Sequence, residues 1–133
     1  MLKLLLIDDE PMVLRLFKEV LEISEFEVHT ANCARDGIRA LEREAFDVVV
    51  TDLRMETPLA GYDVVKAAQQ SSARPLVAVV TAFPVPASDW KRAGADALFV
   101  KGSSGAINLG REIQQLWRQH FGVTRSLAAE KRA

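Results

Sequence analysis

The chain has 133 residues and a formal net charge of −1, with 17 lysines and arginines against 18 aspartates and glutamates. This length suits one globular domain, and the near-zero charge gives no electrostatic reason to bind nucleic acid or an anionic membrane. The single cysteine, Cys33, excludes an internal disulfide framework and a cysteine-built zinc site, and it fits a reducing compartment. Since no apolar run approaches the roughly 20 residues that span a bilayer, we expect a cytoplasmic protein without a membrane partner.

Short apolar runs alternate with amphipathic stretches along the chain. The run Leu2–Ile7 predicts a strand buried on both faces, and Pro11 suits the first turn of a helix. The apolar residues at helical spacing in that helix are Val13, Leu16, Phe17, Val20 and Leu21. The further predicted elements, in chain order, are strand Glu27–Ala31, helix Ala34–Glu44, strand Phe46–Thr51, helix Tyr62–Ser71, strand Leu76–Val80, helix Ala87–Ala93, strand Leu98–Val100 and a last helix that ends near Phe121.

Five strands that alternate with five helices predict an α/β fold, a doubly wound parallel sheet with helices on both faces. Pro84 and Pro86 delay the fourth helix, so we expect it to be shortened and to end at Gly94. Residues 1–121 form the predicted domain. Residues 122–133 form a polar tail without a cap, which we expect to be flexible.

Polar side chains come directly after most of the predicted strands. They are Asp8, Asp9 and Glu10 after the first strand, Asp52 after the third, Thr81 after the fourth and Lys101 after the fifth. Because the carboxyl ends of parallel strands meet at one edge, the carboxylates lie close together and repel one another unless cations are present. Lys101 supplies one cation, and an all-oxygen ligand set favours Mg²⁺ over zinc as another. Two cations beside a carboxylate would hold a phosphoryl group while the carboxylate attacks phosphorus.

In this order and at these strand ends, the residues closely resemble the receiver domains of two-component response regulators. The resemblance rests on Asp8-Asp9, Asp52, Thr81-Ala82 and Lys101, and it covers roughly residues 1–121. It implies the CheY-like strand order 2-1-3-4-5. It also implies that Asp52 takes a phosphoryl group from a sensor histidine kinase or a phosphotransfer protein.

The resemblance implies a role for the other residues as well. The implied Mg²⁺ ligands are Asp8, Asp9, Asp52 and the backbone carbonyl of Arg54, with Asp8 assisting through water. Lys101 would pair with Asp52 or its phosphoryl group, and Thr81 would move toward the phosphoryl oxygens after transfer. That movement would bias a two-state face formed by the fourth helix, fifth strand and fifth helix, where a downstream protein would bind.

Other partners and activities follow from the same resemblance. We expect no enzyme activity beyond phosphoryl acceptance and autodephosphorylation, and the resemblance leaves a homodimer open. About a dozen residues follow the last predicted helix, too few for a helix-turn-helix module, so we expect no nucleic-acid partner within this chain.

The chain departs from the usual receiver pattern in two places. In the loop after Asp52, Glu56 and Thr57 separate Met55 from Pro58, which receivers usually have adjacent, and Glu56 adds a negative charge near the pocket. The usual switch aromatic is replaced by Leu98, its neighbour Phe99 should face the other side of the strand, and Gly102 follows Lys101 where receivers usually have a cis proline.

Several alternatives stay open on the sequence. A degenerate receiver that binds partners without phosphorylation would explain these departures. A Mg²⁺-dependent phosphohydrolase would use the same chemistry, but it would place an Asp-x-Asp pattern after the first strand, where this chain has Asp8-Asp9-Glu10. The three acids alone could instead cap a helix, and Trp90 with Phe83 could form an exposed aromatic patch rather than cover the core.

Overall fold

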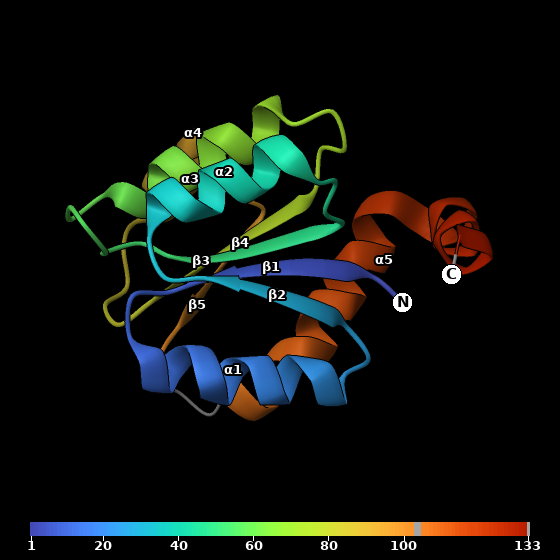
Figure 1. Cartoon of the computed structure of the whole chain (residues 1–133), viewed down its shortest axis with the longest axis horizontal. Helices are drawn as coiled ribbons and strands as arrows, with labels where there is room; N and C mark the ends of the chain where they lie inside the picture. Colours follow the sequence, from blue (N-terminus) through green and yellow to red (C-terminus); the bar gives the residue numbers. More distant parts are fainter. Residues whose placement is uncertain (103–104, 133) are drawn as a thin grey trace.

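The computed structural model describes residues 1–102 and 105–132 of the chain (Figure 1). Its elements are β1 (Lys3–Ile7), α1 (Pro11–Ile23), β2 (Glu27–Ala31), α2 (Ala34–Arg43), β3 (Val48–Asp52), α3 (Ala60–Gln70), β4 (Leu76–Thr81), α4 (Ala87–Ala93), β5 (Ala97–Val100) and α5 (Gly105–Arg132). All strand pairs are parallel, and the sheet order is β2-β1-β3-β4-β5. This confirms the predicted fold class, the strand order and the shortened fourth helix.

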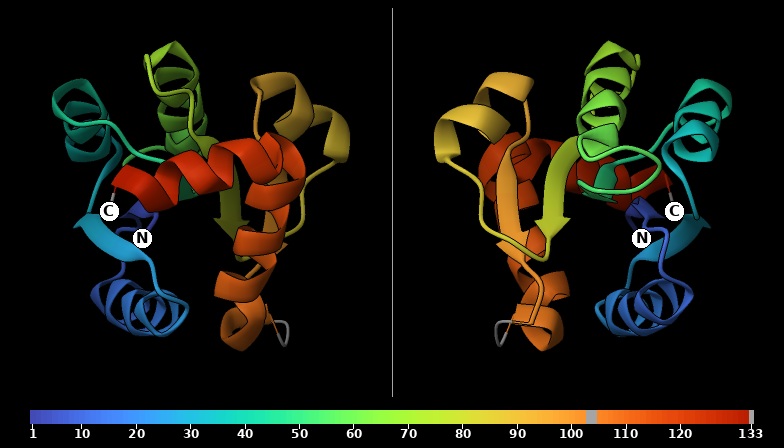
Figure 2. Two further views of the ribbon diagram at one scale, coloured as in Figure 1. Left: turned by 90° about the vertical axis from the view of Figure 1, so that its right-hand side faces the viewer. Right: turned by 90° about the vertical axis from the view of Figure 1, so that its left-hand side faces the viewer.

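The helices cover the two faces of the sheet unequally. Figures 1 and 2 show α1 and α5 on one face and α2, α3 and α4 on the other. Because side chains alternate along a strand, Leu4 and Leu6 of β1 pack with α1 and α5, while Leu5 and Ile7 pack toward α2 and α3. Trp117 of α5 is 1% exposed and lies in the first of these two cores, as its helical spacing predicts.

The prediction for one residue of α1 is wrong. Phe17 and Leu21 are buried against the sheet, but Leu16 is 52% exposed. Successive residues of an α-helix are turned by about 100°, so Leu16 lies beside the stripe centred on Phe17. Leu14 takes its place and packs against the core instead.

The cover over the β5 edge is thin. None of the seven residues of α4 is buried, and all four residues of β5 are only half-buried. Trp90 packs against the core on the α3 side, which supports the covering role, whereas Phe83 is 64% exposed. Gly94 ends α4 with a φ of 103°, a left-handed conformation that favours glycine.

Helix α5 contains a break at Gly122, whose φ and ψ are 73° and 179°. The regular part of the helix therefore ends where the last predicted helix was expected to end. The flexibility of residues 122–133 stays a prediction, and residue 133 lies outside the described residues. Within the described part of the chain, no helix is both long and apolar enough to cross a membrane.

Candidate functional site

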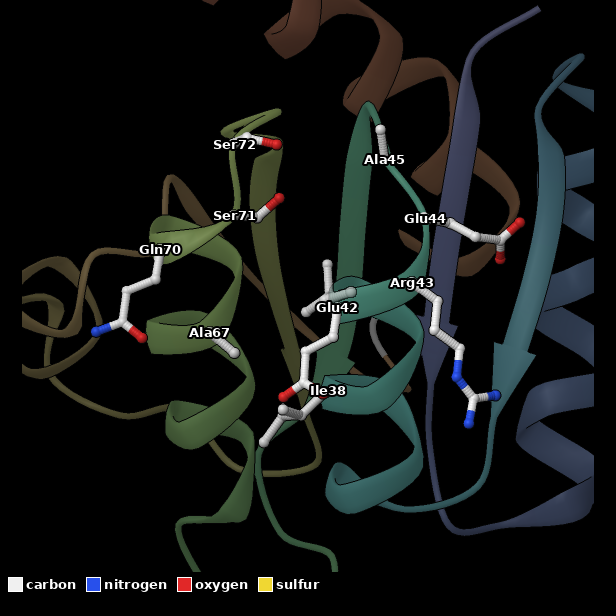
Figure 3. A pocket seen from close by; sticks show the side chains of 10 residues that line it. Ile38, Glu42, Arg43, Glu44, Ala45, Ala67, Gln70, Ser71 and Ser72 are labelled. Atoms are coloured by element: carbon white, nitrogen blue, oxygen red, sulfur yellow. The ribbon is translucent and has the colours of Figure 1, made fainter.

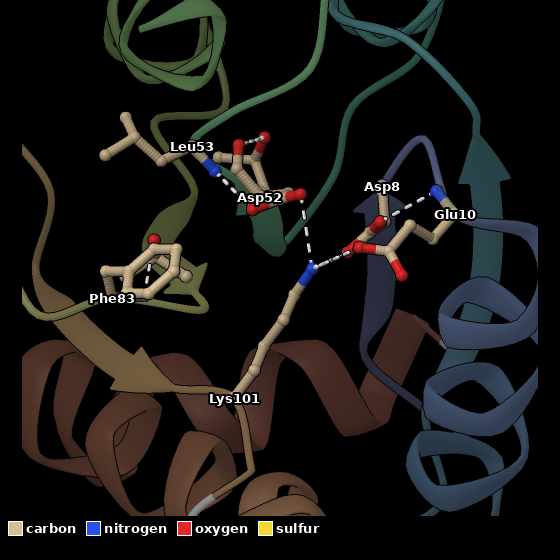
Figure 4. Close-up of polar contacts among 8 residues, drawn as sticks. Asp8, Glu10, Asp52, Leu53, Phe83 and Lys101 are labelled. Atoms are coloured by element: carbon tan, nitrogen blue, oxygen red, sulfur yellow. Dashed lines mark hydrogen bonds and ion pairs between the residues drawn. The ribbon is translucent and has the colours of Figure 1, made fainter. Parts of the chain in front are cut away.

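The polar residues predicted at the strand ends converge at the carboxyl edge of the sheet (Figure 4). Asp52 is the last residue of β3 and Thr81 the last of β4, while Asp8 and Lys101 directly follow β1 and β5. The strand register pairs Ile7 with Thr51, so Asp8 and Asp52 lie at the same level of neighbouring strands. Asp8, Asp52 and Thr81 are only 2%, 6% and 2% exposed.

Lys101 lies between the two buried carboxylates. Its Nζ is 2.7 Å from Oδ2 of Asp8 and 3.2 Å from Oδ2 of Asp52. The carboxylate of Glu10 lies further away, at 3.9 Å, and its side chain is largely exposed. One lysine therefore bridges two strand ends that are far apart in the chain.

The charges at this edge do not balance. Burial raises the pKa of Asp52, the charge of Asp8 raises it further, and the contacts with Lys101 offset this only in part. Burial lowers the pKa of Lys101, but the hydrogen bonds and charges of Asp8 and Asp52 outweigh burial and raise it above its ordinary value. The lysine therefore stays protonated, and the site has negative charge left for a second cation.

The donor set fits a hard divalent cation. Carboxylate oxygens of Asp8, Asp9 and Glu10 lie within 4.8 Å of one another, with Asp8 buried and the other two exposed. Clusters of exposed acidic residues are common without a metal. Here, however, Asp8 is buried beside Asp52, and the pKa of Asp52 is raised. Oxygen-only ligands of this kind suit Mg²⁺. Arg54 is exposed in the loop two residues beyond Asp52.

Both carboxylate oxygens of Asp52 accept a hydrogen bond. The backbone N–H of Leu53 donates to Oδ1 at 2.8 Å, and Lys101 donates to Oδ2 at 3.2 Å. Gly61 makes this arrangement possible, because a Cβ there would lie 2.2 Å from the backbone oxygen of Asp52. Its N–H also donates to the carbonyl of Leu53 at 2.8 Å. Sequence patterns did not single out Gly61, although a glycine at a helix start after a buried strand was an available signal.

Thr81 is held at the start of the loop to α4. Its hydroxyl oxygen accepts a hydrogen bond from the backbone N–H of Phe83 at 3.4 Å (Figure 4). In β5, Leu98 packs toward the α3 side and Phe99 toward the α1 and α5 side, as expected from strand alternation. Gly102 has a φ of 80°, and no cis peptide bond occurs in the described backbone.

The carboxylate of Glu56 binds a helix terminus and is not among the ion-pair partners of Lys101 in the described residues. Its carboxylate accepts hydrogen bonds from the backbone N–H groups of Ala34 and Arg35 at 2.9 and 3.2 Å. Burial raises the pKa of Glu56, but these backbone hydrogen bonds and the charge of Arg35 bring it below the ordinary value. That Glu56 adds negative charge near the pocket stays a prediction, and the structure shows that its carboxylate contacts the first turn of α2.

A groove of about 460 Å³ opens at the C-terminal ends of α2 and α3 (Figure 3). It is lined mainly by polar residues that include Glu42, Arg43, Gln70 and Ser71. These helix ends lie at the amino edge of the sheet, opposite Asp52. The groove therefore shares no residue with the cluster at the carboxyl edge.

Curated proteins similar to this chain are longer transcriptional regulators. AlgB, an alginate biosynthesis transcriptional regulatory protein of Pseudomonas putida, is 36% identical over 101 residues, which are 74% of this chain and 22% of AlgB. The transcriptional regulatory protein GlrR of Escherichia coli is 43% identical over 53 residues, which are 40% of this chain and 12% of GlrR. The chain thus spans no more than 22% of the length of either relative.

Solved structures agree with the fold. A response regulator receiver domain protein from Clostridium thermocellum shares 27% identity at a TM-score of 0.76, with 90% of this chain and 97% of that chain covered. The chemotaxis response regulator CheY4 of Vibrio cholerae shares 25% identity at a TM-score of 0.77, with 87% and 98% covered. TrrA of Thermotoga maritima, solved in complex with Mg²⁺-BeF, supports the fold alone at 24% identity and a TM-score of 0.76, with 87% and 99% covered.

The family model described as "Response regulator receiver domain" matches residues 4–106. This range includes the whole sheet except Lys3, the first residue of β1, and every polar residue of the carboxyl edge. The chain belongs to the response regulator receiver domain family.

Proposed function

We propose that this chain is a phospho-accepting receiver of a two-component system, in which Asp52 takes a phosphoryl group from a histidine kinase or a phosphotransfer protein. The observation that carries the proposal is the position of Lys101 Nζ between the buried carboxylates of Asp8 and Asp52. Lys101 supplies one positive charge to the two carboxylates of Asp8 and Asp52, so net negative charge remains at this edge. A site that binds a metal cation requires such an excess of negative charge. An assembled site of this kind does not favour a degenerate receiver.

The transfer would proceed at a single carboxylate oxygen. An oxygen of Asp52 attacks phosphorus, the bond from phosphorus to the donor histidine nitrogen breaks, and its electron pair stays on that nitrogen. Lys101 already donates to Oδ2 of Asp52, so it is placed to pair with the phosphoryl oxygens. Thr81 would exchange its hydrogen bond with Phe83 for one to the same oxygens.

Mg²⁺ would be held by Asp9, Asp52 and the backbone carbonyl of Arg54, with Asp8 assisting. When bound, it would neutralise charge on the phosphoryl oxygens in the transition state. The buried position of Asp8 and its close contact with Lys101 suit an assisting role, because Asp8 already has a cationic partner. The exposed Asp9 remains available to the ion.

The proposal is tested by incubating the protein with acetyl phosphate and Mg²⁺ and recording its intact mass. We expect a gain of one phosphoryl group that is lost in Asp52→Asn and in the presence of a chelator. Asp63→Asn, an exposed acid in the first turn of α3, is the matched control and should behave like the wild type. Absence of any mass gain in the wild type across Mg²⁺ concentrations would contradict the proposal.

The surface formed by α4, β5 and α5 is the proposed binding face for a downstream protein. Its support is the half-buried β5, the α4 helix without a buried residue and the exposed Phe83 beside Thr81. We expect beryllofluoride, a phosphoryl mimic, to shift the backbone amide signals of β5 in NMR spectra. Unchanged signals there, with shifts at Asp52, would contradict this choice of face.

Two further expectations belong to the same proposal. A cytoplasmic location agrees with the free thiol of Cys33 and with a phosphoryl donor inside the cell. A homodimer remains a prediction, which sedimentation of the protein with and without beryllofluoride would check.

A further inference from the structure

The first turn of α2 takes its cap from a distant segment. Helix α2 starts after Cys33, whose side chain makes no capping hydrogen bond. Glu56, 22 positions after Ala34 in the chain, supplies one carboxylate oxygen to the N–H of Ala34 at 2.9 Å and the other to the N–H of Arg35 at 3.2 Å. Hydrogen bonds to an ionised carboxylate are stronger than neutral ones, and the helix dipole adds to them.

Helix α2 lacks the local contacts that usually stabilise the start of a helix. The first N–H groups of a helix have no partner within the helix. Gly37 weakens α2 further, yet it is required, because a Cβ at Gly37 would lie 2.4 Å from Cδ1 of Ile7. A short helix with an internal glycine and no cap of its own therefore depends on Glu56.

The same contact holds the loop between β3 and α3. The loop is fixed beside Asp52, where Gly61 donates to the carbonyl of Leu53 at 2.8 Å. Further along, Met55 packs against the core on the α2 and α3 side, and its N–H donates to Thr57 at 3.1 Å. Arg54 therefore lies between two residues with fixed backbone contacts, Leu53 and Met55. Glu56 adds a third contact, which joins the loop to helix α2.

We infer that Glu56 is a positioning residue for the phosphorylation site, since its carboxylate fastens the loop of residues 53–59 to α2 and thereby fixes the backbone of Arg54. Glu56 and Thr57 are the residues that separate Met55 from Pro58, where this chain departs from the usual receiver pattern. Residues added to a loop increase the number of its conformations, and an additional contact with a helix reduces that number. The inference rests on the proposed function, because it assumes that the carbonyl of Arg54 binds Mg²⁺.

The test measures Mg²⁺ binding directly, by calorimetric titration without a phosphoryl donor. Residues that orient a metal ligand typically change metal affinity by at least tenfold when removed, so we expect Glu56→Ala to raise the Mg²⁺ dissociation constant about tenfold. Glu56→Gln keeps one acceptor oxygen and should show a smaller increase. Glu42→Gln removes the same charge from an exposed site on α2 and should bind as the wild type does.

A second variant separates the loop from the helix. Serine is a favourable N-cap residue whose hydroxyl accepts from the second or third amide of the helix, so Cys33→Ser in the Glu56→Ala background should restore slow hydrogen exchange at the amide of Arg35 or Asp36. If Glu56 positions the loop, Mg²⁺ affinity stays weak in this double variant although α2 is capped again. Recovery of both properties would overturn the inference, because capping alone would then explain the effect.

Three other outcomes are decisive. Wild-type affinity in Glu56→Ala overturns the inference and leaves the proposed function intact. A wild-type protein that binds Mg²⁺ with the expected Glu56 dependence, but takes no phosphoryl group, supports the positioning role and contradicts the proposed function. A wild-type protein without Mg²⁺ binding would overturn both.

Discussion

Strands β3 and β5 belong to the same sheet but are covered very differently. All five residues of β3 are buried, and five residues of the adjacent α3 are buried with them. All four residues of the edge strand β5 are half-buried, and α4 buries none of its residues. The end of β3 that carries Asp52 is therefore packed firmly, while the edge near Phe83 has little cover.

The proposed function needs both a rigid site and a surface that can rearrange, and the two regions differ in this way. Under the proposed function, Asp52 needs fixed partners to accept a phosphoryl group, and close packing of the central strands provides them. A surface that changes its binding needs a low local cost of rearrangement, which few buried contacts allow.

The largest effect should come from a pair of tryptophans, one in the core that includes Val48 and Val50 of β3 and one in the thinly packed α4. Trp117→Ala empties a fully buried position in α5 and should lower the free energy of unfolding by about 3–5 kcal/mol. Trp90→Ala removes a half-buried side chain of α4 and should cost only about 1 kcal/mol. Urea denaturation of both variants checks this, and equal losses would remove the contrast.

Removal of the lysine charge at the site comes next. Lys101→Met keeps the aliphatic stem but leaves Asp8 and Asp52 without their cation, and it should destabilise the metal-free protein by about 3 kcal/mol. Mg²⁺ should recover part of this loss by binding the folded state. Lys66→Met, an exposed lysine of α3, serves as the control for urea denaturation with and without Mg²⁺. A loss equal to that of the control would contradict the buried network.

Alanine substitutions at Gly61 and Gly94 test how well the backbone of each region accepts a side chain. Gly61→Ala places a Cβ 2.2 Å from the backbone oxygen of Asp52, which cannot move freely, and should cost about 2 kcal/mol and weaken phosphorylation. Gly94→Ala meets the movable side chain of Gln69 and strains a φ of 103°, so it should cost about 1 kcal/mol. Thermal unfolding and acetyl phosphate labelling distinguish the two, and loss of labelling in Gly94→Ala would be unexpected.

The smallest effect has the opposite sign. The pKa of Asp52 is raised, first by burial and then by Asp8, so its ionised form destabilises the metal-free fold. This penalty is absent well below the unfolded-state pKa of an aspartate, near 3.9, and grows as the pH rises through the higher folded-state value. Asp52→Asn should therefore stabilise the protein by about 1 kcal/mol at pH 7 and by nearly nothing at pH 3. Urea denaturation in a chelator at both pH values checks this, and a stability gain that is the same at both would contradict it.

Much of the fold and of the site could be predicted from local patterns. Apolar runs buried on both faces define parallel strands, and Asp8, Asp52, Thr81 and Lys101 stand where those strands end. The buried face of α1 was predicted less accurately. The spacing of apolar residues placed Leu16 on that face, but the structure exposes it. Helical periodicity indicates a face, but only the packing against the sheet decides how wide that face is.

The sequence by itself determined the order of the strands' polar ends, and with it the family and the identity of the candidate acceptor, Asp52. Tertiary structure alone decided which side chains meet. Lys101 reaches Asp52 across 49 positions of the chain, and Glu56 reaches α2 across more than 20. The physical reason is that such contacts depend on strand register, helix placement and loop path together, which no local pattern of residues specifies.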